Sequence, residues 1–156
     1  IDVRGNGGGI VGMCLGIGHP LARDKNSYLG TLKAAGASDL RFNLFPRPKP
    51  YTGPVAILVD ECSASASEIL SAGLQSIERA HVFGIRTAGA ALPSAVQVLP
   101  NKDRFQFAFS AYVDAKGRNI EGVGVKPDFE LPRKRADLLA GKDVILQAAI
   151  DWIKQQ

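Results

Sequence analysis

The pattern of apolar and polar positions in the first half of the chain alternates between strand-like and helix-like periods. Residues 54–59, Pro-Val-Ala-Ile-Leu-Val, form a continuous apolar run of the kind found in a strand buried on both faces. A helix is expected over 65–79, followed by a short strand over 81–84. An amphipathic helix is expected over 144–154, close to the end of the chain. This alternation predicts a parallel or mixed core sheet flanked by helices, which is an α/β fold.

The second half of the chain gathers strand signals. Residues 95–99 and 104–109 alternate between apolar and polar positions, and the Pro-Asn-Lys-Asp turn at 100–103 joins them into a predicted hairpin. Residues 110–113 are expected to extend that hairpin, and turn residues follow at 114–117.

The remaining segments give weaker signals. Residues 40–45 alternate as a half-exposed strand does, and residues 2–4 have the pattern of the end of a buried strand. A helix weakened by glycines is expected within 10–21, and residues 23–39 are expected to be irregular. Pro46, Pro48 and Pro50 predict a stiff extended linker.

The first chemical signal is the block Ser-Ala-Ser-Ala-Ser-Glu at 63–68, between the apolar strand and the helix. A turn of small residues at this junction holds a hydroxyl at the positive end of a helix, where free backbone N–H groups can stabilise an oxyanion. A serine nucleophile needs this environment. Ser65 and Glu68 also have the spacing of a helix capping box, and on this segment alone capping is the commoner meaning.

Three further blocks change that balance. They are Ile-Asp-Val-Arg-Gly-Asn-Gly-Gly-Gly at 1–9, Gly-Ile-Arg-Thr-Ala-Gly at 84–89 and Gly-Arg-Asn-Ile-Glu-Gly-Val-Gly-Val-Lys-Pro-Asp at 117–128. In this order and at these spacings, the four blocks resemble the C-terminal processing, or tail-specific, serine proteases of the S41 peptidases. The resemblance covers residues 2 to about 152 and implies the ClpP/crotonase-like fold.

The resemblance implies a nucleophile at the middle serine, Ser65. The oxyanion donors would then be the N–H of Ala66 and that of a glycine in the first block, with Gly8 preferred and Gly9 second. Glycine suits this position because its backbone N–H can face a substrate with no side chain intervening.

The general base is the point at which the chain departs from the Ser–Lys members of the family. Their lysine position is occupied here by Ala90, which cannot accept a proton, so a Ser–Lys dyad is excluded. The tricorn-like branch uses an upstream histidine and a glutamate that matches Glu121. His81, in an apolar strand, is expected to be structural, and His19, near a helix end, is expected to have a surface or capping role. We therefore expect the base to precede Ile1 in a longer protein, of which this chain would be an N-terminally truncated catalytic domain.

Other matched positions are expected to support the site. Glu68 matches a family glutamate and would cap the helix and tune the polarity of the site, so the candidate catalytic set is Ser65, Glu121 and Glu68. Asp2 and Arg4 are expected to form a structural pair that braces the glycine loop. Asp128 is expected to be a turn residue.

Composition limits the remaining function classes. The 156 residues are 46% hydrophobic and 22% charged, as expected for one domain spanning 1–156. The charge of +4 is mild, and the basic run at 132–135 has no interleaved aromatic residues, so no nucleic-acid partner is expected. No apolar stretch reaches the roughly 18 residues of a membrane span, so no stable membrane insertion is expected. Cys14 and Cys62 are expected to be small buried residues, and their spacing predicts neither a metal site nor a cofactor.

The functional hypothesis is a serine endopeptidase that acts on protein or peptide substrates through an acyl-enzyme. The alternatives are a non-catalytic ligand- or peptide-binding module of the same fold and a crotonase-type enzyme acting on acyl-CoA. By resemblance, the full-length protein would be periplasmic or secreted. The sequence is compatible with both a monomer and an oligomer.

Overall fold

The computed structural model describes residues 1–25, 27–34 and 36–156. One sheet has the order β2-β1-β7, in which β1 (Ser27–Ala34) pairs antiparallel with both β2 (Leu40–Leu44) and β7 (Ser110–Asp114). A second, parallel sheet has the order β3-β4-β8, formed by β3 (Ala56–Val59), β4 (His81–Gly84) and β8 (Phe129–Glu130). Parallel and antiparallel pairing therefore both occur, as the mixed pattern predicts.

The start of the chain runs along the outer edge of β3. The Leu58 N–H donates to the Ile1 carbonyl at 2.8 Å, and the Val3 N–H donates to the Leu58 carbonyl at 3.0 Å. This pairing confirms strand-like character at Asp2 and Val3, whereas Arg4, expected to share it, already lies in a turn; the pairing fixes the start of the following glycine loop beside the end of β3.

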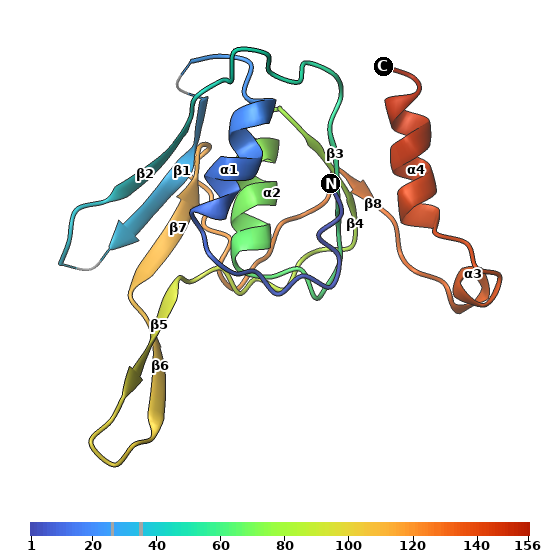
Figure 1. The fold of residues 1–156 in the computed structure, drawn as a ribbon. Coiled ribbons are helices and arrows are strands. Elements are labelled where there is room, and N and C mark those ends of the chain that lie inside the picture. Colours follow the sequence, from blue (N-terminus) through green and yellow to red (C-terminus); the bar gives the residue numbers. More distant parts are fainter. Residues whose placement is uncertain (26, 35) are drawn as a thin grey trace.

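The helices form layers with the sheets (Figure 1). Helix α1 (Met13–Gly18), which continues into the 3₁₀ turn η1 (His19–Leu21), and helix α2 (Ala66–Ser76) lie between the two sheets. Helix α4 (Val144–Ile153) covers the opposite side of the β3-β4-β8 sheet, and the short helix α3 (Arg135–Leu139) precedes it. Ten of the eleven residues of α2 are buried, because this helix contacts both sheets.

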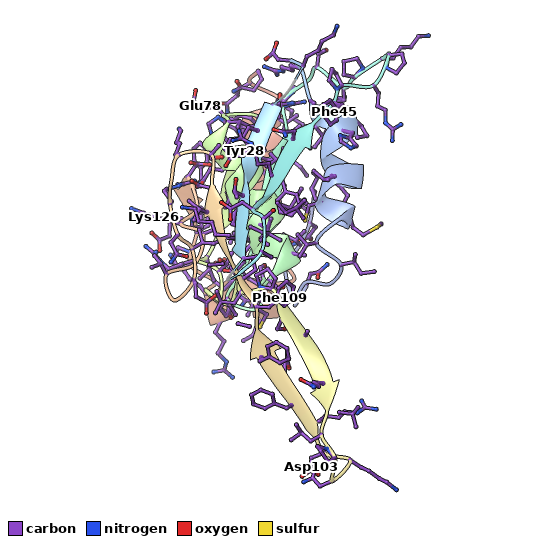
Figure 2. All side chains as sticks on the ribbon, turned by 90° about the vertical axis from the view of Figure 1, so that its left-hand side faces the viewer. Tyr28, Phe45, Glu78, Asp103, Phe109 and Lys126 are labelled. Atoms are coloured by element: carbon purple, nitrogen blue, oxygen red, sulfur yellow. The ribbon has the colours of Figure 1, made fainter. Side chains whose placement is uncertain are left out.

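The strands β5 (Ser94–Val98) and β6 (Arg104–Ala108) form a separate antiparallel pair. This hairpin projects away from the layered body, with Asp103 at its tip and Phe109 at its base (Figures 1 and 2). The predicted hairpin is thus present.

Three expectations about the fold are wrong, and two elements were not predicted. Residues 23–39 are not irregular, since β1 lies among them as the central strand of its sheet. The signal was weak because Gly30 interrupts the strand, where an added Cβ would meet the Val113 carbonyl and the Tyr112 ring. Residues 110–113 do not extend the hairpin, because β7 pairs with β1 instead. Cys62 is exposed rather than buried. Residues 135–139 and 129–130 form a helix and a strand with no sequence prediction.

Candidate active site

The turn between β3 and α2 is bound to the loop that follows residues 1–3. The Asp60 carboxylate accepts hydrogen bonds from the backbone N–H groups of Gly5 at 2.9 Å and Cys62 at 3.0 Å. The Ser63 hydroxyl donates to the Val3 carbonyl at 2.8 Å and is completely buried. Ser63 is therefore a structural residue that joins the first sequence block to the serine block.

Ser65 lies at the last position before α2, in a conformation unusual for a residue with a side chain. Its φ is 54° and its ψ is −120°, a combination that is sterically costly for any residue other than glycine. The Ser65 N–H donates to the Ala90 carbonyl at 2.9 Å and to Glu68 Oε2 at 3.1 Å. A sharp, strained strand-to-helix turn of this kind is typical of a nucleophile elbow, which leaves the hydroxyl accessible above the turn.

The glycine loop packs directly against Ser65. The Ala64 N–H donates to the Asn6 carbonyl at 3.0 Å. A Cβ added to Gly8, whose φ is +99°, would lie 2.5 Å from the Ser65 Cβ and 2.9 Å from the Ala66 nitrogen. Only a glycine fits at this close approach. The expected juxtaposition of the first block with the serine block is present.

The backbone donors of this loop differ in availability. The Gly8 N–H donates to the Asn6 side-chain oxygen at 2.9 Å and is already engaged. Within the described part of the chain, no acceptor receives the N–H of Gly9 or that of Ala66, which belongs to the first turn of α2. Gly9 is therefore the freer of the two glycine donors, the reverse of the order that the sequence suggested.

A cavity of about 190 Å³ opens beside these donors. Its lining includes Gly8, Gly9 and Ala66 on the side of the serine turn, and apolar side chains of α1, α2 and the preceding loop: Ile10, Met13, Cys14, Ile17 and Leu70. The Cys14 thiol is buried and donates to the Ala66 carbonyl at 3.2 Å, and burial raises the pKa of this thiol to about 11. The lining is thus mostly apolar, with Asn6 and Ser67 as its polar side chains, and it includes Gly8, which packs against Ser65.

Glu68 is completely buried below the serine turn, where its carboxylate accepts four hydrogen bonds. Besides the Ser65 N–H, the donors are the Thr87 hydroxyl, the Gly89 N–H at 2.7 Å and the Ala90 N–H at 2.9 Å. The capping contact expected of Glu68 is present. Its carboxylate also fixes the chain at 87–90 beside the serine turn, a function that sequence spacing could not predict.

Glu121 holds the other side of the same segment. One oxygen of its half-buried carboxylate accepts the N–H groups of Ala91 at 2.6 Å and Leu92 at 3.0 Å. The Gly122 N–H also donates to the Gly89 carbonyl at 2.8 Å. The segment 89–92 is therefore fixed by two carboxylates, and the structure brings Ser65, Glu68 and Glu121 together around it. The sequence missed this bracing, although the block at 84–89 marked its position.

The histidines lie elsewhere. His19 Nδ1 accepts the Phe45 N–H at 3.0 Å, and His81 packs against the Trp152 ring at 4.8 Å between ring centroids. In the residues that the structure describes, neither histidine and no lysine is hydrogen-bonded to the Ser65 hydroxyl. His19 is the C-cap residue of α1, which agrees with the capping role expected of it, and the ring packing of His81 agrees with its expected structural role.

Two expected structural residues have broader contacts than predicted. Arg4 does pair with Asp2, but its guanidinium also binds Asp143 at the start of α4, with both N–H contacts at 2.8 Å. Hydrogen bonds from Arg4 lower the pKa of both carboxyl groups. The pair therefore ties the first block to α4. Asp128 accepts the Val82 N–H at 2.7 Å, so it fixes the end of the last block to β4.

A match to a protein-family model identifies the family of this chain. The model of peptidase family S41 matches residues 1–131. The chain belongs to peptidase family S41. It is 29% identical to a carboxyl-terminal-processing protease of Picosynechococcus sp., over 99% of this chain and 37% of that protein. It is also 29% identical to tricorn protease homolog 1 of Streptomyces coelicolor, over 71% of this chain and 10% of that protein.

Solved structures of the family confirm the fold. The photosystem II D1 C-terminal processing protease superposes with a TM-score of 0.71 at 26% identity, covering 83% of this chain and 33% of that one. A chain from Parabacteroides merdae superposes with a TM-score of 0.81 at 24% identity, covering 97% of this chain and 50% of that one. This S41 chain spans about a third of the length of the first curated relatives it matches.

The described residues contain neither a membrane-spanning helix nor a cluster of metal ligands. No helix there has both the length and the apolar character needed to cross a bilayer. No group of three or more histidine, cysteine, aspartate or glutamate side chains in residues 1–25, 27–34 and 36–156 is arranged to hold a metal ion.

Proposed function

We propose that this S41 protein is a serine endopeptidase of the C-terminal processing type, with Ser65 as its nucleophile. The observation that carries the proposal is the strained Ser65 turn, packed against a glycine loop, with the free N–H groups of Ala66 and Gly9 lining one cavity. Free donors at a helix start beside a serine are the components of an oxyanion hole.

The proposed reaction is acyl transfer. The Ser65 oxygen attacks the carbonyl carbon of the scissile peptide, and its proton passes to a general base. The Ala66 and Gly9 N–H groups stabilise the negative charge that develops on the carbonyl oxygen. Collapse of the intermediate breaks the C–N bond, and the leaving amine takes the proton from the base. Water then hydrolyses the Ser65 ester by the same steps.

The general base is proposed to come from a segment preceding Ile1, as in the tricorn-like branch. Ala90 lies at the position of the family lysine and contacts Ser65 through its carbonyl, so the place for a lysine exists but carries no proton acceptor. Glu121 is proposed to support the site, because only one of its carboxylate oxygens is used by the two backbone amides.

The substrate is proposed to be a polypeptide with an apolar residue next to the scissile bond. The cavity beside Ala66 and Gly9 is lined by methionine, isoleucine and leucine side chains, which bind an apolar side chain favourably. A periplasmic or secreted location of the full-length protein is proposed from the resemblance to the C-terminal processing proteases.

Covalent labelling tests the proposal directly. The protein at its natural length is treated with a fluorophosphonate, which reacts with activated serines, and the modified residue is identified by mass spectrometry. We expect modification at Ser65, its loss in Ser65→Ala, and normal labelling in Ser38→Ala, since Ser38 is an exposed serine far from the site in sequence. A folded protein that binds peptides but is never labelled would support the non-catalytic binding module instead.

A further inference from the structure

The β5–β6 hairpin exposes apolar side chains that nothing in the described structure covers. Nine of its ten strand residues are exposed. Val96 and Val98 are 59% and 63% exposed, and Phe105 and Phe107 are 53% and 36% exposed. Two-stranded hairpins are marginally stable in water on their own, so an apolar hairpin that projects from the body is suited to pairing with another chain.

The register shows which backbone groups of β5 are free. The Phe109 N–H donates to the Pro93 carbonyl, and the Leu99 N–H donates to the Asp103 carbonyl. These two hydrogen-bonded pairs lie in the same register as the opposite pair Val96 and Gln106. Hydrogen-bonded pairs alternate along an antiparallel ladder. Ser94, Val96 and Val98 therefore direct their N–H and C=O groups away from β6, toward an edge that no other strand of the described residues pairs with.

This free edge leads to the nucleophile. Ala90 donates to Glu68 and accepts from Ser65, so the chain lies against the serine turn four residues before β5 begins. Four extended residues span at most about 14 Å. A polypeptide that runs along β5 toward Ala90 thus arrives at Ser65. The outer edge of β6 lacks this continuity, because β6 passes through Phe109 into β7.

We propose that the free edge of β5 is a docking strand, to which an extended polypeptide substrate adds as a third, antiparallel strand. The inference rests on the proposed function for the identity of the bound chain. Main-chain hydrogen bonds supply sequence-tolerant affinity in this mode of recognition, and side chains adjust it. The hairpin would then hold the part of the substrate roughly four to eight residues from the scissile bond.

The geometry also specifies which residues of the substrate touch β5. In an antiparallel pair, directly opposite residues place their side chains on the same face. The substrate residues that are hydrogen-bonded to Val96 and Val98 therefore share the face of these two valines. Apolar side chains are expected at those alternate positions of the substrate.

The test measures binding, and so does not depend on turnover. The probe is a fluorescein-labelled peptide of five Thr-Val repeats with an amidated C-terminus, titrated against the Ser65→Ala protein by fluorescence anisotropy. Val96→Pro removes one outward N–H and blocks the β5 edge, while leaving the ladder to β6 intact. Gln106→Pro makes the same change opposite Val96, on the outer edge of β6. Val96→Thr controls for the loss of the valine side chain.

We expect Val96→Pro to weaken binding at least about tenfold, and Gln106→Pro and Val96→Thr to change it less than about threefold. A peptide N-methylated at every valine should lose binding, whereas one N-methylated at every threonine should keep it. Equal effects of the two proline variants, or of the two methylated peptides, would overturn the docking strand.

Sedimentation velocity separates this occupant from a second copy of the chain. We expect the Ser65→Ala protein and its Val96→Pro variant to have the same mass. A dimer that Val96→Pro converts to monomer would assign the hairpin to self-association and overturn the proposal. If the protein with Ser65 intact is not labelled by the fluorophosphonate but the anisotropy results are as expected, the peptidase proposal fails and the docking-strand proposal stands.

Discussion

Ala90 contacts the Ser65 turn, and the β5–β6 hairpin begins only four residues further along the chain. The turn and the hairpin nevertheless differ in burial and in how their backbone groups are bound. Around Ser65, the buried Glu68 carboxylate binds backbone N–H groups, and only a glycine fits at position 8. The hairpin has exposed side chains and a free edge. The difference indicates that the two regions have different roles. Reactive groups need fixed geometry, whereas a surface that accepts varied polypeptide sequences works best through adaptable backbone pairing.

Both glutamates of the candidate set illustrate the rigid half of this contrast. Glu68 and Glu121 use their carboxylates to bind backbone N–H groups on the two sides of the segment 89–92. That segment contacts Ser65 through the Ala90 carbonyl and continues into the hairpin. Three substitutions, two at these glutamates and one in the glycine loop, probe the rigid half of the contrast in order of decreasing effect on the free energy of unfolding.

Removing the Glu68 carboxylate should have the largest effect. Glu68→Ala leaves three donors without an acceptor, in a place that water does not reach, while the Ser65 N–H keeps the Ala90 carbonyl; it should lower the free energy of unfolding by about 4 kcal/mol. Glu68→Gln keeps one acceptor oxygen and should cost less. Urea denaturation measures both variants. Glu78→Ala is the control, since this exposed glutamate makes a single contact with Lys116, and it should change stability by less than about 0.5 kcal/mol. Equal stability of the Glu68 and Glu78 variants would show that the buried contacts do not hold the turn.

Adding a methyl group to the glycine loop should have an intermediate effect. Gly8→Ala forces a Cβ against Ser65 and Ala66 at a backbone angle that favours glycine, and should cost about 2–3 kcal/mol. Fluorophosphonate labelling should fall at least about 100-fold, because displacement of the turn moves the oxyanion donors. Gly7→Ala is the matched control in the same loop, where an added Cβ meets nothing within 4 Å. Normal labelling of Gly8→Ala would separate the glycine loop from the chemistry.

The sequence predicted the parts of this site that depend on local patterns. The strand at 54–59, the helix after Ser65 and the hairpin all follow from residue periodicity, and the four blocks were sufficient to indicate the S41 family. The juxtaposition of the Gly8 loop with Ser65 followed from the family resemblance and is present.

Long-range contacts were beyond the reach of the sequence. The Glu68 contacts with residues 87–90 join positions about 20 residues apart, and the engagement of the Gly8 N–H by Asn6 depends on a side-chain rotamer. Strand β1 was missed because Gly30 interrupts its apolar pattern and because one of its two partners, β7, lies about 80 residues away and leaves no local signal. Sequence spacing identified the residues of the candidate site, whereas the contacts that each of them makes depend on three-dimensional packing.

The Glu121→Gln substitution should have the smallest effect on stability and the most informative effect on rate. Glutamine keeps a carbonyl oxygen that can accept the Ala91 and Leu92 amides, so the free energy of unfolding should change by less than about 0.5 kcal/mol. If the free carboxylate oxygen positions a base or a water, loss of its charge should lower kcat/KM of the natural-length protein at least about tenfold. Glu121→Ala separates bracing from charge, because it releases both amides and should reduce stability and rate together. Wild-type turnover in Glu121→Gln, beside a dead Ser65→Ala, would limit Glu121 to holding the segment 89–92 and remove it from the chemistry.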